Sequence, residues 1–211
     1  MIKLYYHPIS FPSLSPIFAA EAMGVKYEKE VVDLQTGQQN SPEYLAINPY
    51  GKVPAMQDGD FKMAESAAMM RYMARQTGSE FYPDDIQAQG EIDQWIDYVN
   101  HHIRSAVARV QFNRFVAPML GAEVDKSSIQ TGLGFLENNL PVIENQLTDN
   151  AFLCGEKMTL ADIALVAALE PENTAKLDLS SYTHLTAWLK ARRSEVFYTN
   201  VHSHFGAEMG I

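Results

Sequence analysis

The sequence predicts an α/β domain followed by an all-helical domain. In the first 77 residues, short runs of strand-forming residues alternate with helical segments, in the order strand, helix, strand and then strand, strand, helix. Beyond residue 85 no further strand is evident, and apolar residues recur at helical spacing over two long segments. A turn-rich stretch at residues 78–85 separates the two patterns and is the best candidate for a domain boundary.

The composition limits the classes of function. The chain has 211 residues, long enough for one sizeable core or two small domains. Its formal net charge of -10 argues against binding nucleic acid through a basic face. The single cysteine, Cys154, excludes an intrachain disulfide and a thiol metal cluster, and it indicates a reducing compartment. Because no apolar run reaches membrane-spanning length and no signal peptide is evident, we expect a soluble cytoplasmic protein that binds no membrane.

The first 48 residues predict a parallel strand–helix–strand unit. A strand at residues 2–6 is ended by His7-Pro8, and a loop at residues 9–12 follows. A helix is expected at residues 17–23, with Ser13 or Ser15 as its N-cap and Gly24 as its end. A second strand at 27–34 then returns through a right-handed crossover. A polar loop follows, with one helical turn expected near residues 42–45.

The next stretch predicts a hairpin and a helix. An Asp-Gly pair at residues 58–59 is the strongest short hairpin signal in the chain. The expected order is a loop (48–51), a strand (55–57), the tight turn (58–59), a second strand (61–63) and a helix (65–76).

Two features of this stretch suggest a binding site. Pro54 leads into a strand and lacks an N–H, so the bond before it is a candidate for the cis form. A cis bond would turn the main chain of Val53 outward, where it can pair with an extended peptide-like ligand. Glu65 and Ser66 stand at a helix N-terminus, which favours a carboxylate, while the Glu65 carboxylate suits an ammonium. Each feature alone is more often structural, but their order and spacing favour a site for a ligand with an α-amino acid end.

Two apolar stripes dominate the second half. They run from Ile92 to Val110 and from Ile129 to Leu147 in steps of three and four, the spacing of one helix face. We interpret both stripes as the core-facing sides of a long helical pair. We expect a bend in the second helix near Pro141.

A capping motif marks the start of a buried helix. Thr159 and Asp162 have capping-box spacing, with Asp at the third helical position in place of Glu. Residues 163–169 are apolar nearly all round, so this helix should be the buried centre of the second half. Asp162 as a catalytic acid is the alternative, and we favour the cap. A further helix is expected to start at Ser180-Ser181.

The order of elements and the motifs together resemble a known family. The first half has thioredoxin-like topology, but the chain lacks a Cys-x-x-Cys motif, so disulfide exchange within the chain is excluded. Residues 48–55 (Asn-Pro-Tyr-Gly-Lys-Val-Pro-Ala), the Asp-Gly turn and Glu65-Ser66 resemble the glutathione-site core of the cytosolic glutathione transferases. The capping motif resembles that of the family's second domain, and Phe-Tyr-Pro at 81–83 resembles the theta-like branch.

The resemblance covers nearly the whole chain and implies a domain division. A thioredoxin-like glutathione-binding domain is expected at residues 1–77, a linker at 78–85, and an all-helical domain that contributes the electrophile site at 86–211.

In the theta and delta branches, a serine just after the first strand donates a hydrogen bond to the sulfur of glutathione, and Ser10 matches that pattern. The chemical need is clear, because a free thiol has a pKa of about 8.5 and only a few per cent is thiolate at neutral pH. Tyr6 is the rival, since it resembles the phenol that performs this task in the tyrosine-type classes. We place Ser10 ahead of Tyr6. The beta branch uses a cysteine in this loop, and none is present here.

Other roles follow from the resemblance residue by residue. Val53 resembles the residue whose main chain pairs with the cysteinyl part of glutathione, and Lys52 resembles a residue near the glycyl carboxylate. Gln39 falls at the position where theta-like members often have His, which is also near that carboxylate. Glu65 and Ser66 resemble the γ-glutamyl anchors. The electrophile site is expected to include Phe11 and Arg104. For Arg104 we give equal weight to the alternative that it is a solvated helix residue.

The implied activity is that of a glutathione transferase. The enzyme would activate the thiol of bound glutathione for attack on a small hydrophobic electrophile, or for reduction of a peroxide, in detoxification. Glutathione would be the co-substrate, no metal is implied, and a homodimer is expected by resemblance. The alternative is a non-catalytic interaction or regulatory protein that keeps the fold without thiol activation.

Overall fold

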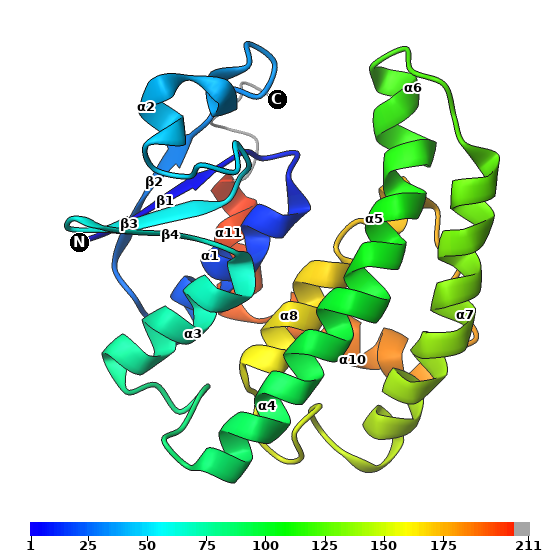
Figure 1. Cartoon of the computed structure of the whole chain (residues 1–211). Helices are drawn as coiled ribbons and strands as arrows, with labels where there is room; N and C mark the ends of the chain where they lie inside the picture. The colour runs from blue at the N-terminus through cyan, green and yellow to red at the C-terminus, as the bar shows by residue number, and fades with distance from the viewer. Residues whose placement is uncertain (205–211) are drawn as a thin grey trace. The chain divides into compact units, whose positions relative to one another are not determined.

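The structure is a computed structural model that describes residues 1–204, with only the backbone of His204 (Figure 1). Two compact units emerge from its contacts: one combines residues 1–83 with the segment that begins at Glu195, and the other is Asp84–Ser194. The predicted boundaries at residues 77 and 86 stay a prediction, and the predicted end of the helical domain, residues 205–211, lies outside the described residues.

The first unit contains a mixed four-stranded sheet, as predicted. The strand order is β2-β1-β3-β4. β1 is parallel to β2 and antiparallel to β3, and the hairpin partners β3 and β4 are antiparallel. The strands are β1 (Ile2–Tyr6), β2 (Tyr27–Val31), β3 (Ala55–Asp58) and β4 (Phe61–Ala64). This βαβ-ββα order confirms the predicted thioredoxin-like topology.

Helices cover both faces of this sheet. α1 and α3 lie on one face and the short α2 lies on the other (Figure 1). Tyr44 of α2 packs edge-to-face on Tyr5 of β1, with ring centroids 6.1 Å apart, in a cluster with Val32 and Ala55. The helical segments are η1 (Phe11–Ser13), α1 (Leu14–Met23), η2 (Gln38–Asn40), α2 (Pro42–Leu45), α3 (Ser66–Thr77) and α11 (Val196–His204).

One local expectation for this unit is wrong, and another holds for the position of the residue but not for its hydrogen bond. β2 ends at Val31 rather than at residue 34, because the Asp33 carboxylate accepts the N–H groups of Gln35 and Thr36 and turns the chain. Ser13, one of the two predicted N-caps, is the N-cap residue of α1, but its side chain makes no capping hydrogen bond, because η1 runs directly into α1 with helical dihedral angles at Ser13.

The chain returns to the first unit at its described end. The ring of Phe18 in α1 contacts Phe197, Tyr198 and His202 of α11, with centroid distances of 5.8, 5.4 and 5.8 Å. Figure 1 shows α11 beside α1. Residues 196–204 fall in the predicted helical domain (86–211), because an apolar helix face does not reveal from the sequence which partner it will cover.

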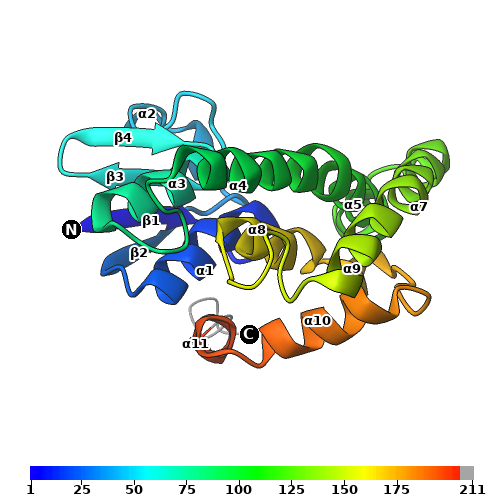
Figure 2. The ribbon, with the colours of Figure 1, turned by 90° about the horizontal axis from the view of Figure 1, so that it is seen from below.

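The second unit consists of helices and connecting loops, as predicted, and it contains an isolated β-bridge between Phe152 and Gly155. α4 continues through η3 into α5 as one helical segment (Figure 2). η3, within this segment, and η4, directly after α5, are π-helical turns. Around η3 the buried positions Val99, Ile103 and Val107 recur in steps of four, which suits the wider π turn. The segments are α4 (Ile86–Tyr98), η3 (Val99–Arg104), α5 (Ser105–Gln111), η4 (Phe112–Val116), α6 (Ala117–Met119), α7 (Lys126–Asp149), α8 (Leu160–Leu169), α9 (Glu172–Ala175) and α10 (Thr183–Arg193).

α7 is one helix despite its glycines and its proline. Gly132 has a packing role, because a Cβ there would lie 2.7 Å from Val110 and 3.0 Å from the carbonyl oxygen of Ala106. Its missing side chain therefore lets α7 approach α5 closely. Pro141 lies inside the helix, and the bend expected there stays a prediction.

α8 forms the buried centre of this unit, as predicted. All ten of its residues are buried, and the capping box of Thr159 and Asp162 is complete. Asp162 is fully buried, and its carboxylate accepts the N–H groups of Leu153 (2.9 Å) and Thr159 (2.8 Å) and the Thr159 hydroxyl (3.1 Å). These bonds support the capping role over the catalytic one.

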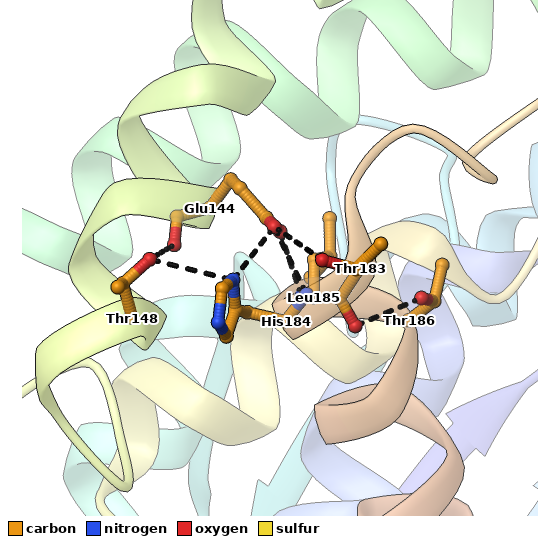
Figure 3. Close-up of polar contacts among 6 residues, drawn as sticks. All are labelled: Glu144, Thr148, Thr183, His184, Leu185 and Thr186. Atoms are coloured by element: carbon orange, nitrogen blue, oxygen red, sulfur yellow. Dashed lines mark hydrogen bonds and ion pairs between the residues drawn. The ribbon is translucent and has the colours of Figure 1, made fainter.

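α10 is capped by a residue from another helix. It begins at Thr183, not at the expected Ser180-Ser181, and Tyr182 before it makes no side-chain cap. The Glu144 carboxylate of α7 instead accepts the N–H groups of His184 (2.9 Å) and Leu185 (2.8 Å) and contacts His184 Nδ1 at 2.9 Å (Figure 3). Partial burial opposes ionisation of Glu144, but these donors hold the pKa of its carboxyl below the ordinary value.

We expect Glu144→Gln to lower the free energy of unfolding by about 1 to 2 kcal/mol at neutral pH, because it removes an anion from a helix N-terminus. Since the folded-state pKa of Glu144 is depressed, its contribution is present above the unfolded-state pKa and is lost as pH falls through the folded-state pKa. Urea unfolding should therefore show a difference in the free energy of unfolding between the wild type and Glu144→Gln, and this difference should become smaller in acid. Glu137→Gln, at an exposed position of the same helix, is the control and should show no such difference; equal effects would refute the capping role.

Candidate functional site

A pocket of about 530 Å³ opens in the first unit, between the loop that precedes β3 and the N-terminus of α3. Four residues that the sequence predicted to share a site are in its wall. The wall residues are Pro12, Asn48, Tyr50, Lys52, Val53, Pro54, Ala64, Glu65 and Ser66.

The loop before β3 is held by buried donors. The Val53–Pro54 peptide bond is cis, as predicted. The carbonyl oxygen of Lys52 accepts two hydrogen bonds, from the Tyr44 hydroxyl and from Asn48 Nδ2, each 2.6 Å long. Burial raises the pKa of Tyr44 to about 12, so this phenol remains protonated and can donate. Within the described residues no hydrogen bond engages the main chain of Val53, which leaves its N–H and C=O available to a ligand.

The other wall of the pocket is the start of α3. Glu65 has φ 71 and ψ 110, a left-handed conformation that costs a non-glycine residue of order 1–3 kcal/mol. Its side chain makes no capping hydrogen bond. Ser66 is the first residue of α3, so the first N–H groups of the helix lie beside its hydroxyl. The arrangement offers donors for a carboxylate and, from Glu65, a carboxylate for an ammonium.

Ser10 lies in a turn after β1. Its N–H donates to the carbonyl oxygen of His7 (2.9 Å), and its own carbonyl oxygen accepts the N–H of Ser13 (2.8 Å). Its side chain is partly exposed and makes no capping hydrogen bond. Pro12, two residues further on, lines the pocket, whereas Ser10 and Phe11 are not among its wall residues.

Tyr6 is a core residue. It is 1% exposed, and its hydroxyl is enclosed without a hydrogen-bond partner among the described residues. Lys29 Nζ lies 5.4 Å from the centre of its ring. A phenol enclosed in this way is a poor candidate for contact with a ligand.

Two further predicted site residues lie outside the pocket wall. Gln39, in η2, has a buried Oε1 atom without a hydrogen-bond partner among the described residues. Arg104 belongs to η3 of the second unit. Asn48 and Tyr50 are wall residues that were not predicted as site residues. Their place inside the motif at residues 48–55 is the sequence signal that could have identified them.

Comparison with known families decides the classification. Residues 1–75 match the glutathione S-transferase N-terminal domain, and residues 95–194 match the glutathione S-transferase C-terminal domain. The chain belongs to the glutathione S-transferase family.

Named relatives agree with this classification. The chain is 34% identical to glutathione S-transferase F10 of Arabidopsis thaliana, over 89% of this chain and 90% of that one. It is 30% identical to human glutathione S-transferase theta-2, over 89% and 78%. Among solved structures, maize glutathione S-transferase I in complex with an atrazine glutathione conjugate is 30% identical, with a TM-score of 0.86 over 96% of each chain.

Two features are absent from the described part of this glutathione S-transferase chain. Within residues 1–204, no helix is long and apolar enough to cross a membrane. Among the described side chains, no group of three or more His, Cys, Asp or Glu is arranged to hold a metal ion.

Proposed function

We propose that this glutathione transferase binds glutathione in the pocket of its first unit and activates the thiol for attack on a small hydrophobic electrophile. The single observation that carries the proposal is the pocket itself. Its wall includes Val53, whose main chain makes no hydrogen bond within the described residues, and the helix N-terminus at Glu65 and Ser66. A tripeptide with an amino acid end has both features that this pocket can recognise.

Each end of glutathione has a complementary group in the proposal. The main chain of Val53 pairs with the cysteinyl residue, and the fixed carbonyl group of Lys52 keeps that segment in place. The γ-glutamyl carboxylate meets the start of α3 and the Ser66 hydroxyl, and its ammonium meets Glu65. The Lys52 ammonium and the Gln39 amide serve the glycyl carboxylate.

Ser10 is the proposed thiol donor. Its hydroxyl donates a hydrogen bond that favours the thiolate over the thiol. Lowering the thiol pKa by about two units corresponds to roughly 2.7 kcal/mol, which is more than one hydroxyl supplies. The N-terminus of the ten-residue helix α1, just beyond Ser10, contributes the remainder through its dipole. The enclosure of the Tyr6 hydroxyl supports Ser10 over Tyr6.

The electrophile site is proposed to use Phe11 with side chains of the helical unit, including Arg104. Phe112 and Phe115 of η4 are 49% and 38% exposed, which supports an apolar substrate. The maize structure with an atrazine conjugate, a relative at 30% identity, supports attack on a carbon electrophile. Peroxide reduction is a second proposed use of the same thiolate. A homodimer and a cytoplasmic location are proposed by analogy with the family.

The experiment that tests this function is a pH titration of the thiol of bound glutathione, followed by the ultraviolet absorbance of the thiolate. We expect retention on immobilised glutathione and a thiol pKa below about 8.5 in the complex. No binding at millimolar glutathione would favour the alternative, a non-catalytic interaction or regulatory protein.

We expect Glu65→Ala and Ser66→Ala to weaken glutathione binding by roughly tenfold or more, because each removes a partner of a charged end of the ligand. Isothermal titration calorimetry would measure the dissociation constants. Lys126→Ala, at the start of α7 in the other unit, is a charge-removal control that should bind normally. Unchanged affinity in both Glu65→Ala and Ser66→Ala would contradict the anchor roles.

A further inference from the structure

His7 accepts two hydrogen bonds within the turn that contains Ser10. The N–H of Ile9 donates to His7 Nδ1 at 3.2 Å, and the N–H of Ser10 donates to the His7 carbonyl oxygen at 2.9 Å. His7 is 4% exposed, so its ring is held in one place by the surrounding core. One residue therefore supplies acceptors for two consecutive N–H groups, and the second of these belongs to Ser10.

The hydrogen bond from Ile9 determines the state of the imidazole. A main-chain N–H can only donate, so Nδ1 must present its lone pair and the ring proton must sit on Nε2. The ring is therefore neutral in this arrangement. A protonated ring would carry a second N–H at Nδ1, directed at the N–H of Ile9, and the bond would be lost.

The surroundings of His7 favour the neutral ring. Burial lowers the pKa of His7, and the nearby charge of Asp33 opposes that shift. Asp33, in the chain after β2, the parallel neighbour of β1, is the charged group among the described residues whose charge acts on the pKa of His7. Its carboxylate accepts the N–H groups of Thr36 and Gln35, and these bonds lower the pKa of Asp33, so it stays ionised.

We propose that His7 is a positioning residue for the transferase reaction: as a neutral imidazole it holds the turn that aims the Ser10 hydroxyl at the thiol of glutathione, and its protonation releases that turn. The inference rests on the role proposed above for Ser10. It assigns a function to a residue that would otherwise be only a buried histidine before a proline.

The test compares His7→Leu with His7→Asn. Leucine fills the space without an acceptor, whereas the Oδ1 atom of asparagine is as many bonds from the main chain as Nδ1 and can accept from Ile9. With glutathione and chlorodinitrobenzene as probes, we expect His7→Leu to lose roughly tenfold in kcat with little change in the KM for glutathione. His7→Asn should recover most of that loss.

The pH profile supplies a readout that a purely structural role would not move. Asparagine does not titrate, and both proteins share the acid limb that arises from the thiol. The ratio of wild-type kcat to His7→Asn kcat should therefore be constant at neutral pH and fall as pH drops through the pKa of His7. Asp33→Asn keeps the acceptor of the 33–36 turn but removes the negative charge that raises the pKa of His7. In this background the decrease in the kcat ratio should therefore occur at lower pH.

Each outcome has a clear meaning. A flat ratio, equal losses in His7→Leu and His7→Asn, or wild-type kcat in His7→Leu alongside an impaired Ser10→Ala would overturn the positioning role alone. Wild-type kcat in Ser10→Ala would overturn the proposed role of Ser10, and the His7 proposal with it. If His7→Leu does not fold, the pH dependence of the ratio of wild-type kcat to His7→Asn kcat still tests the positioning role of His7.

Discussion

Ser10→Ala is expected to lose roughly 100-fold in kcat while keeping most of its affinity for glutathione. The hydroxyl hydrogen bond strengthens as charge develops on sulfur, whereas the ends of the ligand are held by other groups. Steady-state kinetics at saturating glutathione, together with calorimetric binding, would separate the two effects. The bound thiol of the variant should also have a higher pKa than that of the wild type.

Tyr6→Phe is the matched control for this experiment. It removes a hydroxyl that is enclosed and lacks a partner among the described residues, so turnover should stay near the wild-type value. The reverse pattern, a nearly normal Ser10→Ala and an inactive Tyr6→Phe, would show that the thiol donor was assigned to the wrong residue.

The second large effect concerns stability. We expect Asp162→Ala to lower the free energy of unfolding by roughly 3 to 5 kcal/mol, because it leaves the N–H groups of Leu153 and Thr159 buried without an acceptor. Burial raises the pKa of Asp162 to about 6, and the hydrogen bonds from both residues oppose that rise. Urea unfolding followed by circular dichroism would measure the change.

Two controls isolate the cause of that loss. Asp178 also accepts a main-chain N–H, that of Ser180 at 3.0 Å, but it is exposed, so Asp178→Ala should cost no more than about 1 kcal/mol. Asp162→Asn retains one acceptor oxygen, so its loss in the free energy of unfolding should lie between those of Asp162→Ala and Asp178→Ala. If Asp162→Ala costs as little as Asp178→Ala, the capping box does not stabilise the buried helix α8.

Much of the fold could be predicted because its signals are local. The order of strands and helices along the chain of the first unit follows from short apolar runs punctuated by Asp58-Gly59 and Pro54, and α8 follows from its capping motif and apolar sequence. Features that depend on distant partners were missed. The contact of Phe18 with α11, and the cap that Glu144 supplies to α10, join residues far apart in the chain.

The site also combines features with local sequence signals and features that depend on contacts in the folded chain. Lys52, Val53, Glu65 and Ser66 lie within fifteen residues of one another, so a motif could predict that they share a pocket. The hydrogen bonds that fix this wall were not predictable, because Tyr44 and Asn48 meet the Lys52 carbonyl only in the folded chain. Four positions assigned by family resemblance, Ser10, Phe11, Gln39 and Arg104, lie outside the pocket wall.

The most direct measurement is a crystal structure of this protein with glutathione bound. The account predicts the cysteinyl main chain paired with Val53 and the sulfur within hydrogen-bond distance of Ser10 Oγ. A sulfur atom that faces Tyr6, or one with no hydroxyl beside it, would contradict the account.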